Sequence, residues 1–191
     1  MKELALRVAV MVAAAGIATF ASGAARINWT GEGATAAWSD GGNWEGGTAP
    51  GLGDIAVLPA GATVGATEAD VVYMHAAATK LGGIHFSGDD TVLLITNLTA
   101  SKTFTVPFTG KGECRFLNNL TSSQTGINME ADNSGYAGSF VISNSPIVYR
   151  YPHNGFGTTN KVSYWGSTSG SYRYFTFQNK DTIKSMGLQG R

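Results

Sequence analysis

Charged side chains are scarce in this sequence, and neither sign is in excess. Asp, Glu, Lys and Arg make up only 14% of the 191 residues, against about 25% in an average globular domain. Lys and Arg together number 13 and so do Asp and Glu, which gives a formal net charge of zero. A nucleic-acid-binding surface needs a basic excess to neutralise phosphates. We therefore expect no nucleic-acid partner.

Cysteine is almost absent as well. Cys114 is the single cysteine, so no disulfide can form within the chain. It lies in the apolar-flanked segment GECRFLNN, where we expect a buried, unreactive thiol that packs as a small hydrophobe. The fold must then be stabilised by backbone hydrogen bonds and packing alone.

Helix-forming patterns are missing beyond the N-terminus. Helix surfaces are normally built from Glu, Lys and Arg, whereas this chain has 26 glycines and many Thr, Ser and Asn residues. The best helical candidate covers residues 69–83, but Val71, Val72 and Tyr73 favour a strand and no apolar stripe of helical period emerges. We predict strand and turn there.

The N-terminus has the pattern of a secretory signal peptide over residues 1–25. Lys2 and Arg7 precede an apolar or small run at 8–21, and small residues suited to cleavage follow. The run is shorter than the roughly 20 residues of a membrane span, and no later segment is long enough. The pattern predicts a secreted or cell-surface protein without stable membrane insertion after cleavage; an uncleaved anchor is the alternative.

Short β-type segments recur along the rest of the chain, separated by Gly, Asn, Asp and Ser. They begin with IHF at 84–86 and end with RYFTF at 173–177, and no helical segment separates them. This arrangement predicts an all-β fold: a sandwich, a barrel or a solenoid.

An internal match favours the solenoid. TNLTASKT at 96–103 aligns with NNLTSSQT at 118–125, a spacing of 22 residues, within the roughly 20 to 45 residues of solenoid repeats. Stacked coils would place Asn97 over Asn119, with Asn144 as a third rung. We therefore expect a short right-handed parallel β-helix, with a β-sandwich as the alternative.

Several motifs occur in a characteristic order after the N-terminal segment. The first are Trp29-Thr30-Gly31, Trp38-Ser39, Asn43-Trp44 and Pro50-Gly51-Leu52-Gly53-Asp54. The segments at 80–95 and 133–145 follow them. Together these motifs resemble large bacterial surface proteins with autotransporter-associated β-strand repeats: 80–95 resembles the family's strand–turn–strand element, and 133–145 resembles the repeat itself, although it lacks a Gly-Gly-Thr-Thr run. The resemblance implies a passenger-type β-helix, either a short member or an N-terminal fragment, because no translocator follows.

The position of the tryptophan-rich segment indicates its role. It lies between the signal peptide and the first coils, where a solenoid needs a lid over its open interior and strand edges. We therefore predict an N-terminal cap and first strand over 26–60 and solenoid coils over 61–191, with an incomplete C-terminal end. The rings of Trp29, Trp38 and Trp44 should form the buried underside of the cap.

Catalytic patterns are weak. His75, His85 and His153 have no partner at metal-ligand spacing. Glu130 and Asp132 are the nearest approach to a carboxylate pair, and a solvated strand end explains them equally well. We expect no enzyme activity, no metal and no cofactor, with a degenerate polysaccharide lyase or hydrolase as the rival hypothesis.

The predicted function is a non-catalytic exported passenger-type protein with a structural or adhesive role. Its partner would be a polysaccharide or another surface protein. A carbohydrate-binding module is the alternative, because aromatic rings can stack on sugars. The candidate carbohydrate-contact residues are Trp38, Trp44, Tyr149, Tyr151, Tyr172 and Tyr174.

Overall fold

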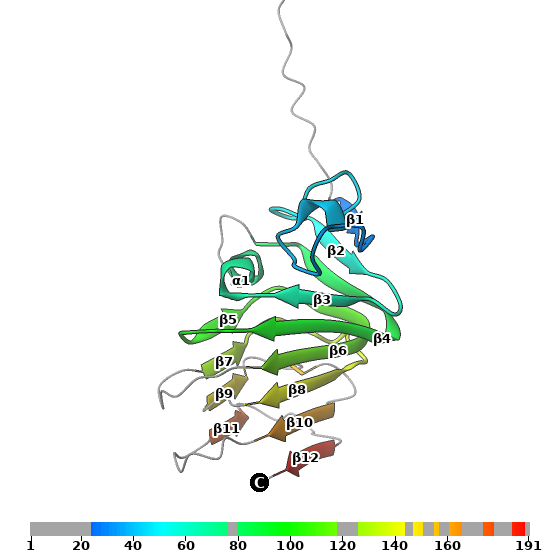
Figure 1. The fold of residues 1–191 in the computed structure, drawn as a ribbon. Helices are drawn as coiled ribbons and strands as arrows, with labels where there is room; N and C mark the ends of the chain where they lie inside the picture. The colour runs from blue at the N-terminus through cyan, green and yellow to red at the C-terminus, as the bar shows by residue number, and fades with distance from the viewer. Residues whose placement is uncertain are drawn as a thin grey trace, which may run out of the picture.

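The protein is a parallel β-solenoid of about four turns, as expected from the sequence (Figure 1). The computed structural model describes residues 24–75, 80–117, 126–143, 147–150, 155–156, 161–165, 174–177 and 185–189. The predicted signal peptide lies outside these residues. Within them, no helix is long and apolar enough to cross a membrane.

Two parallel sheets run down the solenoid. The larger sheet has the order β1-β2-β4-β6-β8-β10-β12, and β3 pairs with β4 beside this path. Its strands are β1 Arg26–Asn28, β2 Ile55–Leu58, β3 Thr63–Ala66, β4 Gly83–Thr96, β6 Phe108–Leu117, β8 Ser139–Ser143, β10 Lys161–Trp165 and β12 Ser185–Gln189. The smaller sheet, ordered β11-β9-β7-β5, consists of β5 Lys102–Phe104, β7 Gly126–Met129, β9 Ile147–Arg150 and β11 Tyr174–Phe177.

The long strand β4 bends in the middle and so forms two sides of its coil. Its first half pairs with β2 and its second half with β3, and the register with β6 shifts between Ser87 and Val92. The buried Thr91 fixes the bend, because its hydroxyl donates to the carbonyl of Pro59 at 2.9 Å. Strand β5 and the strands of the smaller sheet form the third side. A coil therefore has three sides, which we call its arms. In the next coil, the first arm shortens to a turn around Tyr136.

The coil length varies instead of repeating at a fixed spacing. Ile84 pairs with Phe108, 24 residues on, whereas Val92 pairs with Glu113, 21 residues on. Turns of different length and the bend in β4 cause the variation, so the 22-residue match is close to one coil without defining the others. The predicted stack of Asn97 on Asn119 and the third rung at Asn144 involve positions outside the described residues.

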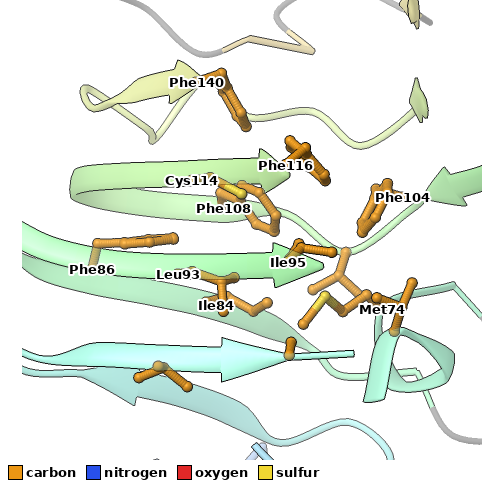
Figure 2. Packing of buried hydrophobic residues seen from close by; sticks show 14 of the residues in the cluster. Met74, Ile84, Phe86, Leu93, Ile95, Phe104, Phe108, Cys114, Phe116 and Phe140 are labelled. Atoms are coloured by element: carbon orange, nitrogen blue, oxygen red, sulfur yellow. The ribbon is translucent and has the colours of Figure 1, made fainter. Parts of the chain in front are cut away.

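Phenylalanines fill the interior of the coils (Figure 2). Phe108 and Phe140, from consecutive coils, stack with ring centroids 5.9 Å apart, and Phe104 meets Phe116 edge-on at 5.1 Å. Cys114 points into the same interior and is fully buried, as predicted. Side chains in the second half of β6, residues 112–117, alternate between inside and outside, which is the period-2 pattern of a strand.

The burial of Cys114 leads to a testable expectation about its reactivity. Burial raises the pKa of the thiol well above its ordinary value, with a smaller contribution from the charge of Glu113. Because the thiolate is the reactive form, iodoacetamide should not label Cys114 in the folded protein at pH 8 and should label it fully in denaturant. Rapid labelling of the native protein, measured by intact mass, would contradict this packing.

Residues Glu68–His75 form the helix α1, so the prediction of strand and turn was wrong there. Asp70 caps the start of the helix: its carboxylate accepts hydrogen bonds from the Thr67 backbone N–H at 2.8 Å and from the Thr67 hydroxyl at 2.9 Å, which is one half of a capping box. Val71 and Met74 turn inward and are fully buried. The Thr-x-x-Asp pattern at residues 67–70 is a signal for this helix start that the prediction of strand and turn did not take into account.

Helix α1 lies beside β5, at the position where the smaller sheet would otherwise continue (Figure 1). Thr105, just after β5, donates its N–H to the carbonyl of Met74 at 3.2 Å. The Glu68 carboxylate binds Lys102 at 2.6 Å and the N–H of Thr99 at 2.7 Å. The helix therefore closes this edge of the sheet and is fixed there by an ion pair.

Replacing Glu68 with glutamine should weaken this attachment. The hydrogen bond and charge of Lys102, with hydrogen bonds from Thr99, lower the pKa of Glu68 from 4.5 to about 2. A depressed folded-state pKa stabilises the protein above the unfolded pKa, and this contribution disappears as the pH falls from about 4.5 to about 2. Since the carboxylate is 30% exposed, we expect E68Q to cost about 1 kcal/mol at pH 7. Urea unfolding of both proteins should show this difference, and it should vanish near pH 2. A cost that did not change with pH would contradict the ionic origin.

Candidate functional site

The three N-terminal tryptophans are buried, as the cap interpretation required. Trp29, Trp38 and Trp44 are 5%, 0% and 2% exposed. The ring of Trp44 contacts the other two edge-on, with ring centroids 5.0 Å from Trp29 and 4.8 Å from Trp38. The indole N–H of Trp44 donates a hydrogen bond to the backbone carbonyl of Trp38 at 2.7 Å. Trp38 and Trp44 therefore present no ring face to a sugar in this structure.

Two polar side chains organise the loop that carries these rings. The Asp40 carboxylate accepts hydrogen bonds from the Thr35 N–H at 3.0 Å and the Thr35 hydroxyl at 3.1 Å. The backbone bond from Thr35 is the largest cause of the lowered pKa of Asp40. Asn43 is buried; its amide accepts from the Gly33 N–H at 2.9 Å and donates to the carbonyls of Thr35 and Ala37 at 2.6 and 3.1 Å. The loop thus has a polar exterior and an aromatic underside.

The cap covers the strand edges at the N-terminal end. Trp29, directly after β1, forms an antiparallel bridge with Trp44. On β3, Gly65 accepts a hydrogen bond from the Trp38 N–H at 2.6 Å and donates to the Ala36 carbonyl at 2.7 Å. Helix α1 covers the edge of β5. All three arms therefore begin under a cover, so this end offers little free edge for strand addition.

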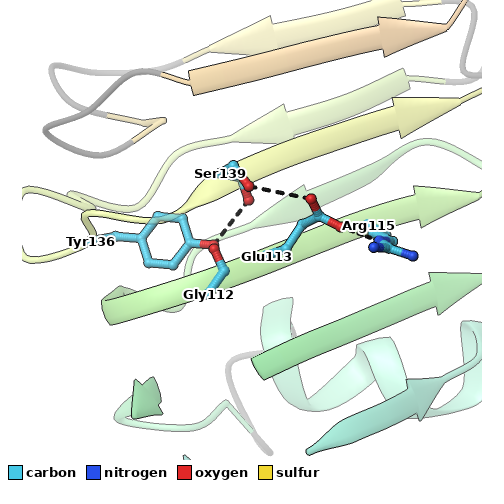
Figure 3. Close-up of polar contacts among 5 residues, drawn as sticks. All are labelled: Gly112, Glu113, Arg115, Tyr136 and Ser139. Carbon is cyan, nitrogen blue, oxygen red and sulfur yellow. Dashed lines mark hydrogen bonds and ion pairs between the residues drawn. The ribbon is translucent and has the colours of Figure 1, made fainter. Parts of the chain in front are cut away.

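The repeat-like segment at 133–145 contains a buried polar turn. The Asn133 amide accepts from the Phe108 N–H at 2.7 Å and donates to the Gly155 carbonyl at 2.6 Å. It therefore links the preceding coil to the following one. The Tyr136 hydroxyl lies 3.0 Å from the carbonyls of both Gly112 and Ser139 (Figure 3).

Burial raises the pKa of Tyr136 far above its ordinary value, which keeps the phenol neutral. Close packing also explains Gly138 in the same motif. A Cβ atom there would lie 2.2 Å from the Gly112 carbonyl oxygen and 2.5 Å from the Tyr136 hydroxyl oxygen. The Asn-x-x-Tyr-x-Gly pattern, noticed in the sequence only through the family resemblance, thus has a physical role in joining coils.

The outward face of the larger sheet forms the best candidate for a contact surface. Its hollow, of about 400 Å³, is lined by Glu113, Arg115, Leu117, Val141 and Ser163. Leu117 is 41% exposed, and among the described residues the only other exposed large apolar side chain is Leu52. We call this set of five residues the outer face. It spans β6, β8 and β10, so three successive coils contribute to it.

The charges of the outer face compensate each other. Glu113 pairs with Arg115 on the same strand and accepts a hydrogen bond from the Ser139 hydroxyl at 3.4 Å (Figure 3). Ser139 also lines a neighbouring hollow of about 280 Å³ together with Asp89, Gly112, Ala137 and Gly138. The face is therefore open, shallow and close to neutral.

The fourth tryptophan occupies a register position beside the outer face. Trp165 of β10 pairs with Ser143 of β8, which in turn pairs with Leu117. Neither Trp165 nor any residue of the outer face was predicted from the sequence as a contact residue. No local motif marks them, because they come together only when separate coils stack in register.

Of the four tyrosines predicted to contact carbohydrate, only Tyr149 and Tyr174 lie among the described residues. Tyr149 lies in β9 and pairs with Asn128 and Thr176, whereas Tyr174 of β11 pairs with Ile147. Tyr149 and Tyr174 are thus not direct register partners. Tyr151 and Tyr172 lie outside the described residues, and carbohydrate contact by this group stays a prediction.

The other titratable residues are dispersed. His85 Nδ1 lies 3.0 Å from the Thr109 hydroxyl, and partial burial lowers the pKa of His85 and of His75. Asp132 accepts from a turn N–H and Glu130 is exposed. His153 lies outside the described residues, among which no group of three His, Cys, Asp or Glu side chains could hold a metal ion.

No protein-family model, curated protein or solved structure matches this chain. The resemblance to autotransporter-associated repeat proteins therefore rests on the motifs alone. Functional inference must start from the fold and from the geometry of the outer face.

Proposed function

We propose that the protein is an exported, non-catalytic β-solenoid that acts through surface contact, in a structural or adhesive role. The observation that carries this proposal is the outer face: a shallow surface built from three coils, with an exposed leucine and a self-compensated ion pair. Small-molecule sites usually enclose most of the ligand. A surface of this shape suits an extended partner better.

The chemistry of the outer face favours a partner of low charge. Glu113 and Arg115 neutralise each other, and Leu117, Val141 and Ser163 offer apolar and hydroxyl contacts. A polysaccharide or another surface protein fits this description. A nucleic acid does not, because its affinity depends on several unpaired Lys or Arg residues.

Sequence motifs support the proposed export route and the proposed family. The N-terminal pattern supports secretion or display on the cell surface. The Trp, Asn-Trp and Pro-Gly-x-Gly-Asp elements support membership among autotransporter-associated β-strand repeat proteins. On this proposal the passenger-type solenoid is the functional unit, and the buried tryptophans serve as its cap.

A carbohydrate-binding module is the second candidate. Trp165 shares a register row with Ser143 and Leu117, and this supports the candidate because aromatic residues can stack on sugar rings. On this candidate the sugar contact would lie at the outer face, since Trp38 and Trp44 are buried. A degenerate lyase or hydrolase has less support. The Asp132 carboxylate accepts a hydrogen bond from the Ser134 N–H, and no hydrogen bond among the described residues joins it to Glu130.

Binding measurements with matched variants test the proposal. The chain without residues 1–25 is immobilised and exposed to a panel of neutral and charged polysaccharides and to envelope proteins of the producing cell. We expect at least one partner to bind, and we expect L117S/V141S to weaken that binding by roughly tenfold or more, as loss of central apolar contacts does. The control L52S changes a leucine in the cap that is 66% exposed and should bind normally.

Three outcomes would overturn the proposal. They are the absence of binding to every partner, equal loss in the control L52S, and release of sugar fragments from any polysaccharide. The variant W165F separates the two candidates: it should weaken binding and reduce any ligand-induced fluorescence change if sugar stacking is involved. Protein contact without stacking should leave polysaccharide binding undetectable.

A further inference from the structure

A hollow of about 300 Å³ lies in the N-terminal cap and shares no residue with the outer face. Its walls are Trp29, Gly31, the loop at 33–36, Asn43 and Thr63 of β3. We call it the cap hollow. No charged side chain among the described residues lines it. Sites for small molecules begin at about this volume, so the cap hollow has the size of a site for one small, neutral ligand.

Trp29 turns an unpaired hydrogen-bond donor toward the cap hollow. The residue is only 5% exposed, and its indole N–H has no acceptor among the described residues. The nitrogen is nevertheless open to solvent, because the sealed side-chain atoms without a partner belong to Trp38 and Asn128. The Trp44 N–H, by contrast, donates to a backbone carbonyl. Polar groups in so buried a residue normally have a partner, and a ligand oxygen would supply it here.

Gly31 keeps the Trp29 donor uncovered. A Cβ atom at this position would lie 3.3 Å from the Trp29 indole nitrogen. The φ of Gly31 is +73°, in the left-handed region that glycine adopts without strain. Because Gly31 itself lines the cap hollow, the space beside the indole N–H belongs to the hollow. A larger side chain at residue 31 would cover the donor.

Hydroxyl groups supply the complementary chemistry. Thr63 is exposed, and its hydroxyl, which can both donate and accept, has no partner among the described residues. The Asp40 carboxylate of the same loop is already occupied by the N–H and the hydroxyl of Thr35. A small neutral ring with several hydroxyls fits this set of groups, whereas an ion finds no unpaired opposite charge.

We propose that the cap hollow binds a neutral sugar ring. One sugar hydroxyl accepts the hydrogen bond of the Trp29 indole N–H, and a second shares a hydrogen bond with the Thr63 hydroxyl. The contact uses the N–H of Trp29 and leaves Trp38 and Trp44 buried as the underside of the cap. The site is separate from the outer face, and the proposal does not rest on binding there.

The register is compatible with two sources of the ring, a free sugar or the end of a sugar chain. Thr63 pairs with Val92, which pairs with Glu113 of the outer face, so the cap hollow lies two strands away on the same sheet. A trisaccharide distinguishes the sources. A chain end should bind more tightly than the monosaccharide and also shift the backbone signal of Val92. A free-sugar site should bind the monosaccharide at least as tightly.

Proton–nitrogen correlation spectra of the protein test the proposal, because each indole N–H gives its own signal and W29F identifies that of Trp29. The probes are glucose, galactose, mannose and N-acetylglucosamine, with glycerol as the control for a non-specific hydroxyl compound. We expect at least one sugar to move the Trp29 indole signal to higher frequency and to slow its exchange with solvent. The Trp44 signal should not move, since its N–H is already hydrogen-bonded.

Two variants and a matched control locate the site. A34L fills the cap hollow from an exposed position and should abolish the response. T63V removes the hydroxyl, keeps the β-branched shape and should weaken sugar binding roughly two- to tenfold. The control A69L makes the same change as A34L at an exposed position of α1 outside the hollow and should bind normally. Thermal unfolding shows that the variants fold.

The proposal would be overturned if no sugar moved the Trp29 signal, if glycerol had an equal effect, or if A34L or T63V bound sugar normally. The outer-face variant L117S/V141S should keep the Trp29 response. Failure at the cap hollow is therefore distinguishable from failure of the surface-contact function at the outer face.

Discussion

Replacing Asn133 with alanine should lower the free energy of unfolding by about 3 kcal/mol. The Asn133 amide is fully buried and is hydrogen-bonded to the Phe108 N–H and the Gly155 carbonyl, which belong to the coils before and after it. Alanine would leave both backbone groups unpaired inside the protein, and each buried group without a partner costs about 1 to 3 kcal/mol. Urea denaturation followed by circular dichroism measures the effect.

The control for this substitution is S134A, at the exposed neighbouring position. It should change stability by less than about 0.5 kcal/mol. If N133A lost less than about 1 kcal/mol, the polar link between coils would not have the role assigned to it. A changed denaturant slope would indicate that the coils no longer unfold together.

Replacing Trp38 with alanine should destabilise the protein by about 3 to 5 kcal/mol. Its ring is 0% exposed and packs on Trp44, so truncation leaves a large cavity beneath the cap. The loop around Trp38 also covers the edge of β3 through Gly65. We therefore expect W38A to aggregate as well as unfold more easily, since a loosened cap exposes that edge.

Two comparisons make the result specific. W38F should lose less, because a phenyl ring fills part of the cavity, and L52A in the same cap should be nearly neutral. Thermal unfolding with light scattering reports both stability and aggregation. Equal stability of W38A and the parent protein would contradict the role of the tryptophans as the sealed underside of the cap.

The sequence predicted the all-β solenoid because its evidence is spread along the whole chain. Short β-type segments, turn residues and few charges all favour stacked strands. The burial of Trp29, Trp38 and Trp44 followed from position, since a solenoid must be covered where it begins. The burial of Cys114 was predicted from its apolar neighbours. These predictions needed only local pattern and general architecture.

The sequence predictions failed where contacts between distant segments determine the local structure. Helix α1 forms because the Asp70 carboxylate caps its first turn and because it covers the edge of β5, a requirement that strand propensity at Val71 and Val72 does not reveal. The bend at Thr91 changes the spacing between coils, so a fixed repeat could not predict the register.

The outer face was also beyond sequence reasoning. Its residues, from Glu113 to Ser163, become neighbours only through the exact pairing of β6, β8 and β10. Trp38 and Trp44 attracted attention as aromatic residues in polar sequence, although the same composition suits a lid with a wet exterior. Local chemistry identified the rings, and the fold determines which way they point.

Disulfide mapping of the register tests the central claim, a parallel solenoid in consecutive stacked coils. Arg115 pairs with Val141, and Cα atoms of adjacent paired strands lie about 4.8 Å apart, within the range a disulfide spans. Under mild oxidation R115C/V141C should cross-link almost completely in the native state and only weakly in denaturant, with the buried Cys114 unaffected. The off-register control E113C/S143C should not cross-link. Cross-linking of the control, or none in R115C/V141C, would contradict the solenoid and favour another all-β arrangement such as the sandwich.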